Sequence, residues 1–516
     1  MKPVPTHSSP TRLRQILRIG TLSSATSLLL LSGCTVGPNY HRPDAPTAPA
    51  FKETAVPVPP PNPPGGGWKQ VSPNDSALRP NWWEIYQDPE LDKLEQQVAV
   101  SNQTLKASYE QYMQARAAVQ FYRSQYFPTI QVGPSAAREK QSTNRPLYLA
   151  GSKSTYNDLF LTGGVSWEPD LWGNIRRAVE SQKATVQATA ADLANVDLSI
   201  RSELATDYFE MRGLDTQQRL LDNTVVQYEE YLQLTQARFK GGVATDEDVA
   251  LAQTQLDQTR AQAIDVGVAR AQYEHAIATL TGVPASSFGL PFAPLDLQLP
   301  QVPVGVPSQL LERRPDVAGA ERRADAANAQ IGIAIAAYYP TVNLTGAGGF
   351  ESKSGGTLIQ GPSSLWSLGG SAVELLFDAG RRHSLTEQAR DVYEQNVANY
   401  RQTVLQAFQE VEDNLSGLRI LNSESAAQQR AVDSANRSLL ISTTRYKGGV
   451  TTYLEVITAQ TTQLSNERTA ADIITREFVA SVQLILALGG GWEATDLPSP
   501  SQVSEKPGTA DTTIHQ

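Results

Sequence analysis

The chain contains long stretches whose pattern of apolar and polar residues predicts helix. Residues 173–240 contain no proline and one internal glycine, Gly213, and they are rich in Ala, Gln, Leu and Glu, which all favour helix. At 1.5 Å per residue such a helix would be roughly 100 Å long, far beyond an ordinary globular helix. A similar stretch runs from about residue 381 to residue 447. We therefore expect two long helices of the coiled-coil kind.

The segment after the first long helix carries a narrow seam of apolar and small residues. The seam positions recur at spacings of three and four, at Val249, Ala252, Leu256, Thr259, Ala263 and Val266. This spacing is typical of one helix packed along another, and small side chains let two helices approach closely. We expect a return helix here, and a second one that ends near Leu488.

Other segments show the alternation that is typical of strands. Their large apolar residues stand at every second position, at Leu159, Leu161, Val165 and Trp167, and again at Val342, Leu344, Trp366 and Leu368. Period two gives each strand one apolar face and one polar face. Such a strand fits a lipid-facing barrel with a polar lumen, or a half-buried hairpin of a soluble domain. The alternation alone leaves both readings open.

These elements occur twice because the chain contains an internal repeat. Three landmarks keep their order and nearly their spacing: Arg238–Val243 recurs as Arg445–Val450, Phe127–Ile130 as Tyr339–Val342, and Trp167–Trp172 aligns with Val373–Asp378. Three matches in register indicate a duplication. Each copy is predicted to contain a helix (Leu91 to about Tyr126, and Ser308 to about Tyr338), a β-hairpin, a long helix and a return helix.

The N-terminus has the features of a lipoprotein signal. Basic residues precede an apolar stretch, and Leu31-Ser32-Gly33-Cys34 resembles the bacterial lipobox. Cys34 is the only cysteine of the chain, so it forms no internal disulfide, and we predict that it is acylated. By analogy with sorted lipoproteins, Thr35 in place of an Asp favours the outer membrane.

The signal sequence, the Pro/Gly-rich stretches and the repeat together predict six segments in chain order. They are a lipoprotein signal peptide (1–33), a lipid-anchored Pro/Gly-rich linker (34–80), repeat 1 (81–285), a linker (286–307), repeat 2 (308–492) and a disordered tail (493–516).

The charge, the apolar runs and the motifs of the chain argue against several classes of function. The net charge of −10 argues against a nucleic-acid binder, whose surface would be basic. Beyond residue 33 no apolar run approaches the roughly 20 residues that a membrane helix needs. The five histidines are scattered, and the chain has no phosphate-binding loop, nucleophile elbow or metal-ligand spacing. We predict no enzyme activity, no cofactor and no metal site.

Several motifs together resemble the TolC-like outer-membrane factor family, and within it the lipoprotein branch that serves RND-type efflux systems. The similarity covers roughly residues 80–490. It lies in the Pro-rich leader after Cys34, Trp82-Trp83 with Asp88–Leu91, Leu311–Asp316 (LERRPD), Tyr339–Thr341 and the two Lys-Gly-Gly-Val turns. LERRPD is the most specific of these motifs. From the residues themselves we expect Arg313, Arg314 and Asp316 to be structural.

The resemblance implies a fold that is mainly α with a small β part. A duplicated repeat would form a long α-helical barrel, and four strands per chain would join a trimeric twelve-strand transmembrane β-barrel. The implied function is the exit duct of a tripartite efflux system, which exports small molecules such as drugs or toxic compounds. The implied partners are two further copies of the chain, a periplasmic adaptor (membrane fusion) protein, an inner-membrane RND-type pump and outer-membrane lipid.

The implied location is the outer membrane of a Gram-negative bacterium, with a lipid anchor and an extension into the periplasm. Two alternatives remain from the sequence. The chain could be a type I secretion duct, or a periplasmic coiled-coil scaffold lipoprotein.

The resemblance also implies functional residues at the periplasmic tip. The pore gate would comprise Asp246, Asp248, Leu454, Glu455 and Thr458, where Thr458 replaces the branch's usual Asp. The adaptor-contact turns would be Gly241, Gly242, Val243, Gly448, Gly449 and Val450. A second interpretation needs no pore, because Thr245-x-x-Asp248 and Thr452-x-x-Glu455 both match the capping box of a helix N-terminus. The two roles are compatible.

Overall fold

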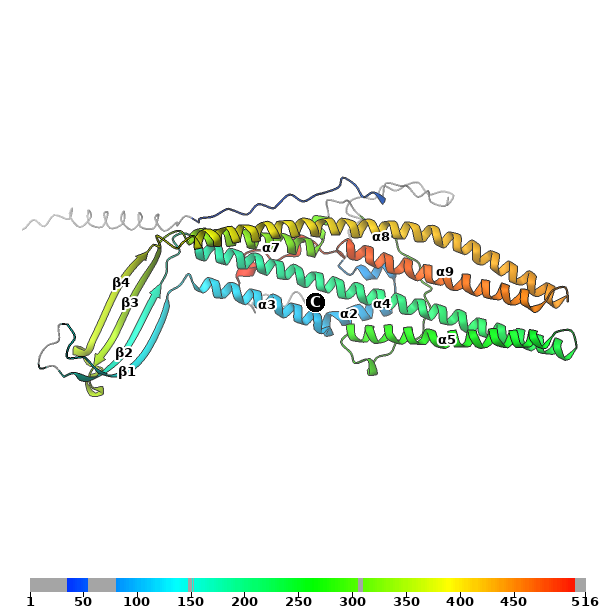
Figure 1. The fold of residues 1–516 in the computed structure, drawn as a ribbon, viewed down its shortest axis with the longest axis horizontal. Helices are drawn as coiled ribbons and strands as arrows, with labels where there is room; N and C mark the ends of the chain where they lie inside the picture. The colour runs from blue at the N-terminus through cyan, green and yellow to red at the C-terminus, as the bar shows by residue number, and fades with distance from the viewer. Residues whose placement is uncertain (1–34, 54–79, 147–150, 152, 305–309, 506–516) are drawn as a thin grey trace, which may run out of the picture.

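The computed structural model describes residues 35–53, 80–146, 151, 153–304 and 310–505. The molecule is elongated, with a strand region at one end and helical hairpins at the other (Figure 1). Its main elements are η2 (Trp82–Tyr86), α2 (Pro89–Ser101), α3 (Gln103–Ser124), β1 (Thr129–Lys140), β2 (Thr155–Trp167), α4 (Asn174–Lys240), α5 (Asp246–Leu280), α6 (Leu310–Arg313), α7 (Pro315–Ala336), β3 (Thr341–Ser352), β4 (Ser364–Val373), α8 (Arg381–Lys447) and α9 (Tyr453–Ala487).

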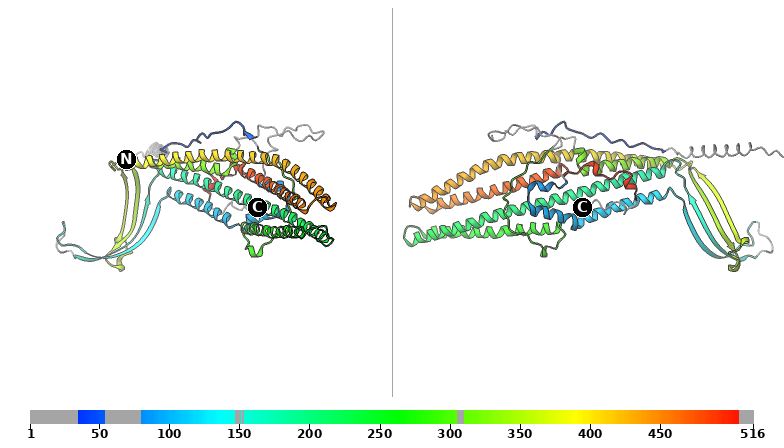
Figure 2. Two further views of the ribbon diagram at one scale, coloured as in Figure 1. Left: turned by 45° about the vertical axis from the view of Figure 1, so that its right-hand side comes forward. Right: turned by 180° about the vertical axis from the view of Figure 1, so that it is seen from behind.

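The element order repeats, and the lengths of the long helices repeat with it. The helices α4 and α8 each span 67 residues, and α5 and α9 each span 35 residues. The expected duplication is therefore present in the fold. In Figure 2 the two long hairpins, α4 with α5 and α8 with α9, run side by side in both views.

The first predicted helix, Leu91 to Tyr126, is wrong as a single element. The backbone of Asn102 is extended (φ −67°, ψ 121°) and divides the segment into α2 and α3. The Asn102 side chain accepts from Leu105 N–H at 2.9 Å and donates to Leu280 O at 2.8 Å. An N-cap bond and a tertiary contact to the end of α5 thus stabilise the break.

The internal glycine of α4 marks a close helix crossing. A Cβ atom on Gly213 would lie 2.2 Å from the Thr475 hydroxyl oxygen of α9. No larger residue could stand here without moving the two helices apart. Around this crossing lies the largest apolar core, which includes Trp82, Tyr208, Phe209 and Phe478.

The four strands form one antiparallel sheet in the order β1-β2-β3-β4. The register places Ile130 beside Val165, and Val165 beside Gly346, which pairs with Leu368. The other face is polar or small, with Gln131, Thr162, Thr345 and Ser367. The expected two-faced strands are present, and β1 and β4 each have one strand neighbour within the described residues.

The predicted linker 286–307 is packed rather than loose where the structure describes it, up to residue 304. Leu290 and Leu295 are buried in the main core. Asp215 of α4 is fully buried and accepts from Ala293 N–H at 3.0 Å and from Arg270 at 2.7 Å. The buried carboxylate therefore ties this segment to the surfaces of α4 and α5.

The prediction of disorder from residue 493 is wrong for residues 493–505. The short 3-10 turn η8 (Gln502–Ser504) places Val503 at 1% exposure among Tyr112, Val119 and Val186. Gln187 also donates to Pro498 O at 2.9 Å. Val503 and the hydrogen bonds to the backbone of the tail together hold it against α3 and α4.

The LERRPD motif joins three helices at one point, as its expected structural role requires. Arg314 donates to Asp316 at the start of α7, to Glu410 of α8 at 2.7 Å and to Ala487 O of α9 at 2.9 Å. The guanidinium of Arg314 is buried, and it donates hydrogen bonds to acceptors on three helices. A buried charge needs such partners, because it has lost its contact with water. Among the described residues, no helix is long and apolar enough to cross a membrane.

Candidate functional site

The two turns at the far end of the helical hairpins have the same backbone geometry. Gly242 and Gly449 have φ values of 71° and 74°, a left-handed conformation that disfavours other residues. Each turn closes with a 2.9 Å hydrogen bond, from Val243 N–H to Arg238 O and from Val450 N–H to Arg445 O. The expected adaptor-contact residues are all exposed at these turns: Gly241, Gly242, Val243, Gly448, Gly449 and Val450.

The helices that follow the turns begin differently. At α5 the expected capping box is present: Asp248 N–H donates to Thr245 Oγ1 at 3.1 Å, and Thr245 N–H donates to Asp248 Oδ2 at 2.9 Å. At α9 the expected box is wrong, because Thr452 makes no side-chain cap. Glu455 instead lies 3.6 Å from Arg445 of the preceding helix.

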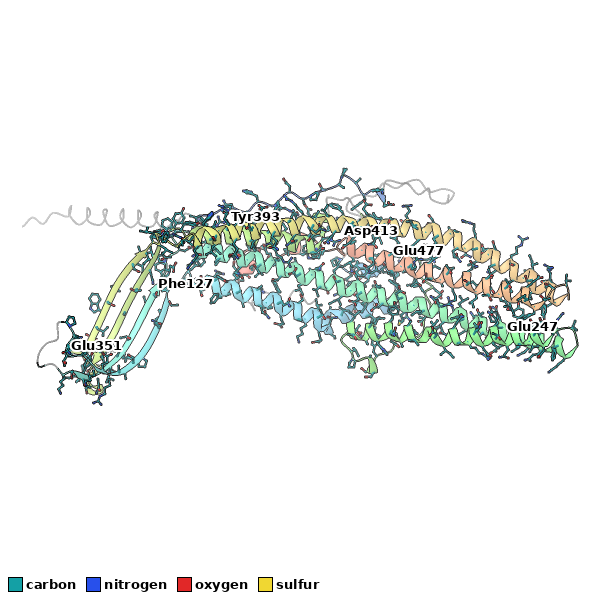
Figure 3. All side chains as sticks on the ribbon, viewed as in Figure 1. Phe127, Glu247, Glu351, Tyr393, Asp413 and Glu477 are labelled. Atoms are coloured by element: carbon teal, nitrogen blue, oxygen red, sulfur yellow. The ribbon has the colours of Figure 1, made fainter. Side chains whose placement is uncertain are left out.

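This difference determines which carboxylates at the tip are engaged in local hydrogen bonds and which are exposed to solvent. Asp246 is exposed and makes no part of the cap, whereas Asp248 is half-buried and has both cap partners. Glu455 is half exposed and paired with a cation that is equally exposed. Such surface pairs contribute little stability, so Glu455 can leave its partner at small cost. Figure 3 shows the same end of the molecule around Glu247.

The remaining predicted gate residues lie on one face of α9. Leu454 is 60% exposed, and the Thr458 hydroxyl donates to Leu454 O at 2.9 Å one turn later. The opposite face of this turn, with Tyr453 and Val456, is buried against the other helices. The helix therefore presents an apolar side chain, a carboxylate and a hydroxyl together at the surface.

A contact between the two hairpins was not predicted from the sequence. The guanidinium of Arg238 lies 4.6 Å from the centre of the Tyr446 ring and donates to Lys447 O at 3.1 Å. The rings of Tyr446 and Tyr453 are 5.3 Å apart. Through these contacts the turn of the first repeat packs against the turn of the second repeat.

The signal for this contact was the one difference between the two turn motifs. Phe239 and Tyr446 occupy the same place in the repeat, yet Phe239 is 45% exposed and Tyr446 is 3% exposed. The same position of the repeat is therefore exposed to solvent in the first copy, at Phe239, and buried in the contact between the hairpins in the second, at Tyr446. An aromatic pair across a turn, Tyr446 and Tyr453, is the pattern to look for.

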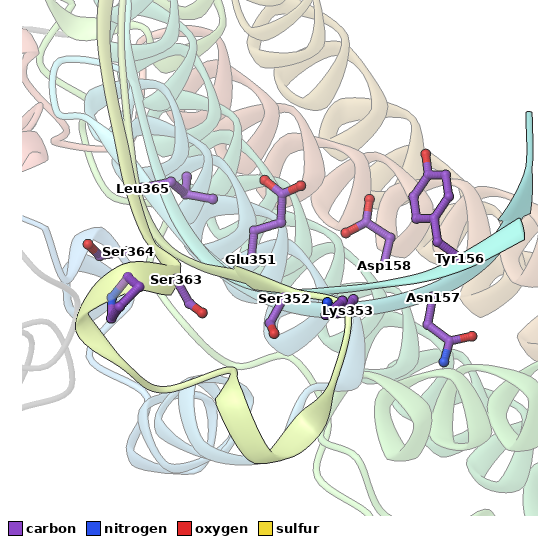
Figure 4. A pocket seen from close by; sticks show the side chains of 10 residues that line it. Tyr156, Asn157, Asp158, Glu351, Ser352, Lys353, Ser363, Ser364 and Leu365 are labelled. Atoms are coloured by element: carbon purple, nitrogen blue, oxygen red, sulfur yellow. The ribbon is translucent and has the colours of Figure 1, made fainter. Parts of the chain in front are cut away.

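The opposite end of the molecule carries a polar site between the strand ends. Asp158 of β2 and Glu351 of β3 point to the same side of the sheet, and Tyr156 lies beside them (Figure 4). Both carboxylates stand on the polar face in the strand register. Acidic side chains therefore occur at both ends of the elongated molecule. The predicted acylation site, Cys34, lies outside the described residues.

A family model described as outer membrane efflux protein matches residues 94–283 and residues 306–490. The two matched stretches correspond to the two repeats. The chain belongs to the outer membrane efflux protein family.

Relatives within the outer membrane efflux protein family match over almost the whole chain. The toluene efflux pump outer membrane protein TtgC of Pseudomonas putida is 29% identical over 478 residues, 91% of this chain and 95% of that protein. Outer membrane protein OprJ of Pseudomonas aeruginosa is 28% identical over 92% of this chain and 96% of its own length. The solved outer-membrane channel OprN superposes with a TM-score of 0.81 at 29% identity, over 89% of this chain and 100% of that one.

These likenesses decide between the alternatives that the sequence left open. This outer membrane efflux protein has the duplicated fold of outer-membrane channels and is the exit duct of an efflux system. It resides in the outer membrane of a Gram-negative bacterium and extends into the periplasm. The expected efflux duct is confirmed, and the scaffold interpretation loses its support.

Proposed function

We propose that three copies of this chain close one twelve-strand β-barrel, through which small toxic molecules leave the cell. The observation that carries the proposal is the sheet. It has four strands, a face of exposed large apolar side chains, and two edges without a strand partner among the described residues.

The exposed face has the character of a lipid contact. Trp366 is 78% exposed and Leu368 is 81% exposed, on the same face of β4. Exposure of these apolar side chains to water is unfavourable, whereas their contact with lipid tails is favourable. Edge strands cannot remain unpaired in lipid, because each free N–H and C=O group would lack a partner. Pairing of β4 with β1 of the next copy would satisfy both edges.

In the trimer, the tip residues would form rings around the pore. Threefold symmetry turns Leu454 into an apolar constriction, and Asp246, Asp248 and Glu455 into rings of carboxylates that favour cations. Thr458 would add a hydroxyl ring, where the resembled branch places a second acid. These residues are proposed as the gate because four of the five are exposed on the described chain, and Asp248 is partly exposed.

The partners and cargo follow from the family and from the exposed turns. We assign the turns Gly241–Val243 and Gly448–Val450 to an adaptor protein that joins the duct to an RND-type inner-membrane pump. Relatives are named for toluene and antibiotic efflux, and small apolar or amphipathic toxicants are the proposed cargo. Acylation at Cys34 would anchor each copy to the membrane.

The test changes one face of β4 at a time. Leu368→Asp places a carboxylate on the apolar face and is expected to abolish heat-modifiable trimers in the outer-membrane fraction. The matched control is Ser367→Asp, which places the same charge one residue away on the polar face and is expected to keep them. A purified Cys34→Ser chain that is monomeric and extractable without detergent would sink the barrel proposal.

A further inference from the structure

The motif Trp82-Trp83 with Asp88 lies at the start of the first repeat, and the proposed duct gives it no role. Both tryptophans are buried, and the segment continues into α2, which lies between α3 and α5 along the length of the molecule (Figure 1). Asp88 caps α2 by accepting from Glu90 N–H at 2.9 Å, and its other oxygen accepts from the Tyr208 hydroxyl of α4 at 2.6 Å. The motif therefore docks η2 and α2 on α4.

The docked face of α2 contains a completely buried carboxyl group. Glu95 is 0% exposed, and Leu91, Leu94 and Val98 of the same helix are buried as well. Neither oxygen of the Glu95 carboxyl group makes a hydrogen bond to the described part of the chain. An ionised carboxylate in this place would lack both water and hydrogen-bond donors, and such a group is more stable as the neutral acid.

The cation beside Glu95 is already engaged with another carboxylate. Arg201 of α4 donates from Nε to both oxygens of Asp197, each at 2.9 Å. Its Nη1 donates to the backbone oxygen of Glu95 at 2.9 Å and lies 3.5 Å from Oε2 of the same residue. The guanidinium also lies 4.7 Å from the centre of the Trp83 ring. One cation thus stands between two carboxylates, and it is closer to the more exposed one.

The other charged groups that act on Glu95 are acidic. Asp92 lies one turn earlier on α2, and Glu84 of η2 adds negative charge beside Asp92. Burial raises the pKa of Glu95 well above its ordinary value; Arg201 opposes this shift, whereas Asp197 and Asp92 reinforce it. The charges that face Glu95 from α2 and α4 therefore leave its own charge without a full counterion.

We propose that Glu95 is a proton-binding site that keeps α2 docked on α4, and that loss of the proton sets Glu95 and Asp197 in competition for Arg201. With the proton bound, Glu95 is neutral and Arg201 stays with Asp197. When the proton leaves to solvent, two carboxylates share one guanidinium, and a negative charge stays unpaired in the core. Arg201 then gives up Asp197, or α2 separates from α4 and Glu95 reaches water.

The sign of the pH dependence follows from the raised pKa of Glu95 in the docked state. The docked chain binds the proton more tightly than the undocked chain. Docking is therefore most favourable below the ordinary pKa of a glutamate and weakens as the pH rises to the pKa of the docked state. All of these contacts lie within one copy of the chain, so the site does not depend on the proposed β-barrel.

The first experiment observes the proton directly. Infrared spectroscopy of the full chain in detergent at neutral pH separates the carbonyl stretch of a protonated carboxyl group from the bands of carboxylates. Glu95→Gln should remove one protonated signal, whereas Glu110→Gln, at an exposed position of α3, should leave the spectrum as it is. Glu95→Gln keeps the shape of the neutral acid, and circular dichroism checks that it folds. An unchanged signal in Glu95→Gln would overturn the proposal.

A second variant tests the competition for Arg201. Asp197→Asn removes the carboxylate that engages the guanidinium, so Arg201 becomes free to pair with Glu95. We expect the signal of protonated Glu95 to disappear at a lower pH than in the parent chain. Asp222→Asn, at an exposed position of the same helix, should leave this titration unchanged. Identical titrations in Asp197→Asn and the parent would refute the exchange of partners.

The third experiment measures docking through protease access. Trypsin cleaves after Lys93, an exposed residue of α2, only when the helix opens. The cleavage rate follows the open population when opening and closing are fast. This population should rise by up to about tenfold per pH unit until Glu95 has lost its proton.

Cleavage after Lys240, beside an exposed turn, corrects for the pH dependence of trypsin itself. The ratio of the Lys93 rate to the Lys240 rate should rise with pH in the parent chain and stay flat in Glu95→Gln. A flat ratio in the parent, or an equal rise in Glu95→Gln, would show that Glu95 does not control docking.

Discussion

Asp170 holds the guanidinium and the backbone of Arg176 with one carboxylate oxygen. The Asp170 Oδ2 accepts from Arg176 N–H at 2.9 Å and from Nε at 3.1 Å. In the second repeat Asp378 Oδ2 accepts from Arg382 N–H at 3.2 Å and from Nε at 2.7 Å. Each long helix therefore begins with the same aspartate–arginine bond, and Arg382 holds the pKa of Asp378 below its ordinary value.

This relationship corrects the alignment of the repeats. The sequence alignment pairs Asp378 with Trp172, whereas the structure makes Asp378 the counterpart of Asp170. The reason is a shorter turn in the second repeat. Asp170 reaches the helix through Leu171, Trp172 and Gly173, but Asp378 reaches it through Ala379 and Gly380.

Asp170→Ala should destabilise the start of α4. The substitution removes the acceptor for Arg176 and for the first backbone N–H groups, and N-terminal caps of this kind are worth about 1 to 2 kcal/mol. We expect a lower thermal unfolding midpoint in detergent. Glu230→Gln, on an exposed part of the same helix, is the control. An unchanged midpoint for Asp170→Ala would contradict the capping role.

The paired substitution Leu454→Ala and Glu455→Ala should raise single-channel conductance in planar bilayers. It removes the proposed apolar ring and the proposed carboxylate ring together. Leu440→Ala, an exposed apolar change on α8, should leave conductance as it is. Equal conductance in the paired variant and the parent would remove these residues from the gate.

Arg238→Gln should loosen the contact between the two hairpins. The change removes a cation–π contact with Tyr446, of the order of 0.5 to 1 kcal/mol at such sites, and weakens the bond to Lys447 O. We expect more frequent channel openings. Arg445→Gln, the equivalent position in the other repeat, breaks only a half-exposed pair and should change openings less. The reverse ranking would refute the contact's role.

Val503→Asp should unseat the C-terminal segment from α3 and α4. The carboxylate would enter an apolar site beside Tyr112 and Val186, and burying an unpaired charge costs about 2 kcal/mol or more. We expect limited digestion to cleave residues 497–505 faster than in the parent chain. Ser501→Asp, which adds the same charge at an exposed position, is the control. Identical digestion of the two variants would contradict the packing.

Asp207 should make stability depend on pH. Burial, with Glu203 and Glu210 nearby, raises the pKa of Asp207 to about 6 from 3.8. The folded chain then binds more protons than the unfolded chain between these values, so this group's contribution to stability falls as pH rises from about 4 to about 6. The penalty is fully present above that window.

Asp207→Asn removes the titrating group, so the unfolding midpoint should vary less across this window. Asp222→Asn, at an exposed position of the same helix, is the matched control. The measurement is the thermal unfolding midpoint at several pH values. A slope that persists in Asp207→Asn would assign the dependence to other groups.

Much of the fold was readable from local patterns. The proline-free stretch 173–240 predicted α4 within a residue or two, because a long helix depends on propensity that every residue carries. The strand alternation predicted the faces of the sheet, since period two follows from backbone geometry alone. The repeat was visible because three short motifs recur in register, and the turns were visible because the left-handed positions at Gly242 and Gly449 favour glycine.

Other features required contacts between distant parts of the chain. The side chain of Asn102 bonds to Leu280 O where two helices meet, and Val503 packs among apolar residues of α3 and α4. Glu455 carries a capping pattern, yet its carboxylate pairs with Arg445. A local pattern cannot show which of two available partners lies nearer after folding.

The sequence by itself determined the repeat, the long helices, the two-faced strands and the glycine turns, because each depends on residues close together in the chain. Only the tertiary structure decided that Arg238 rests on Tyr446 and that Gly37 fits against Gly332. Those contacts join residues about 200 or more positions apart, and their energy depends on packing that no local spacing encodes.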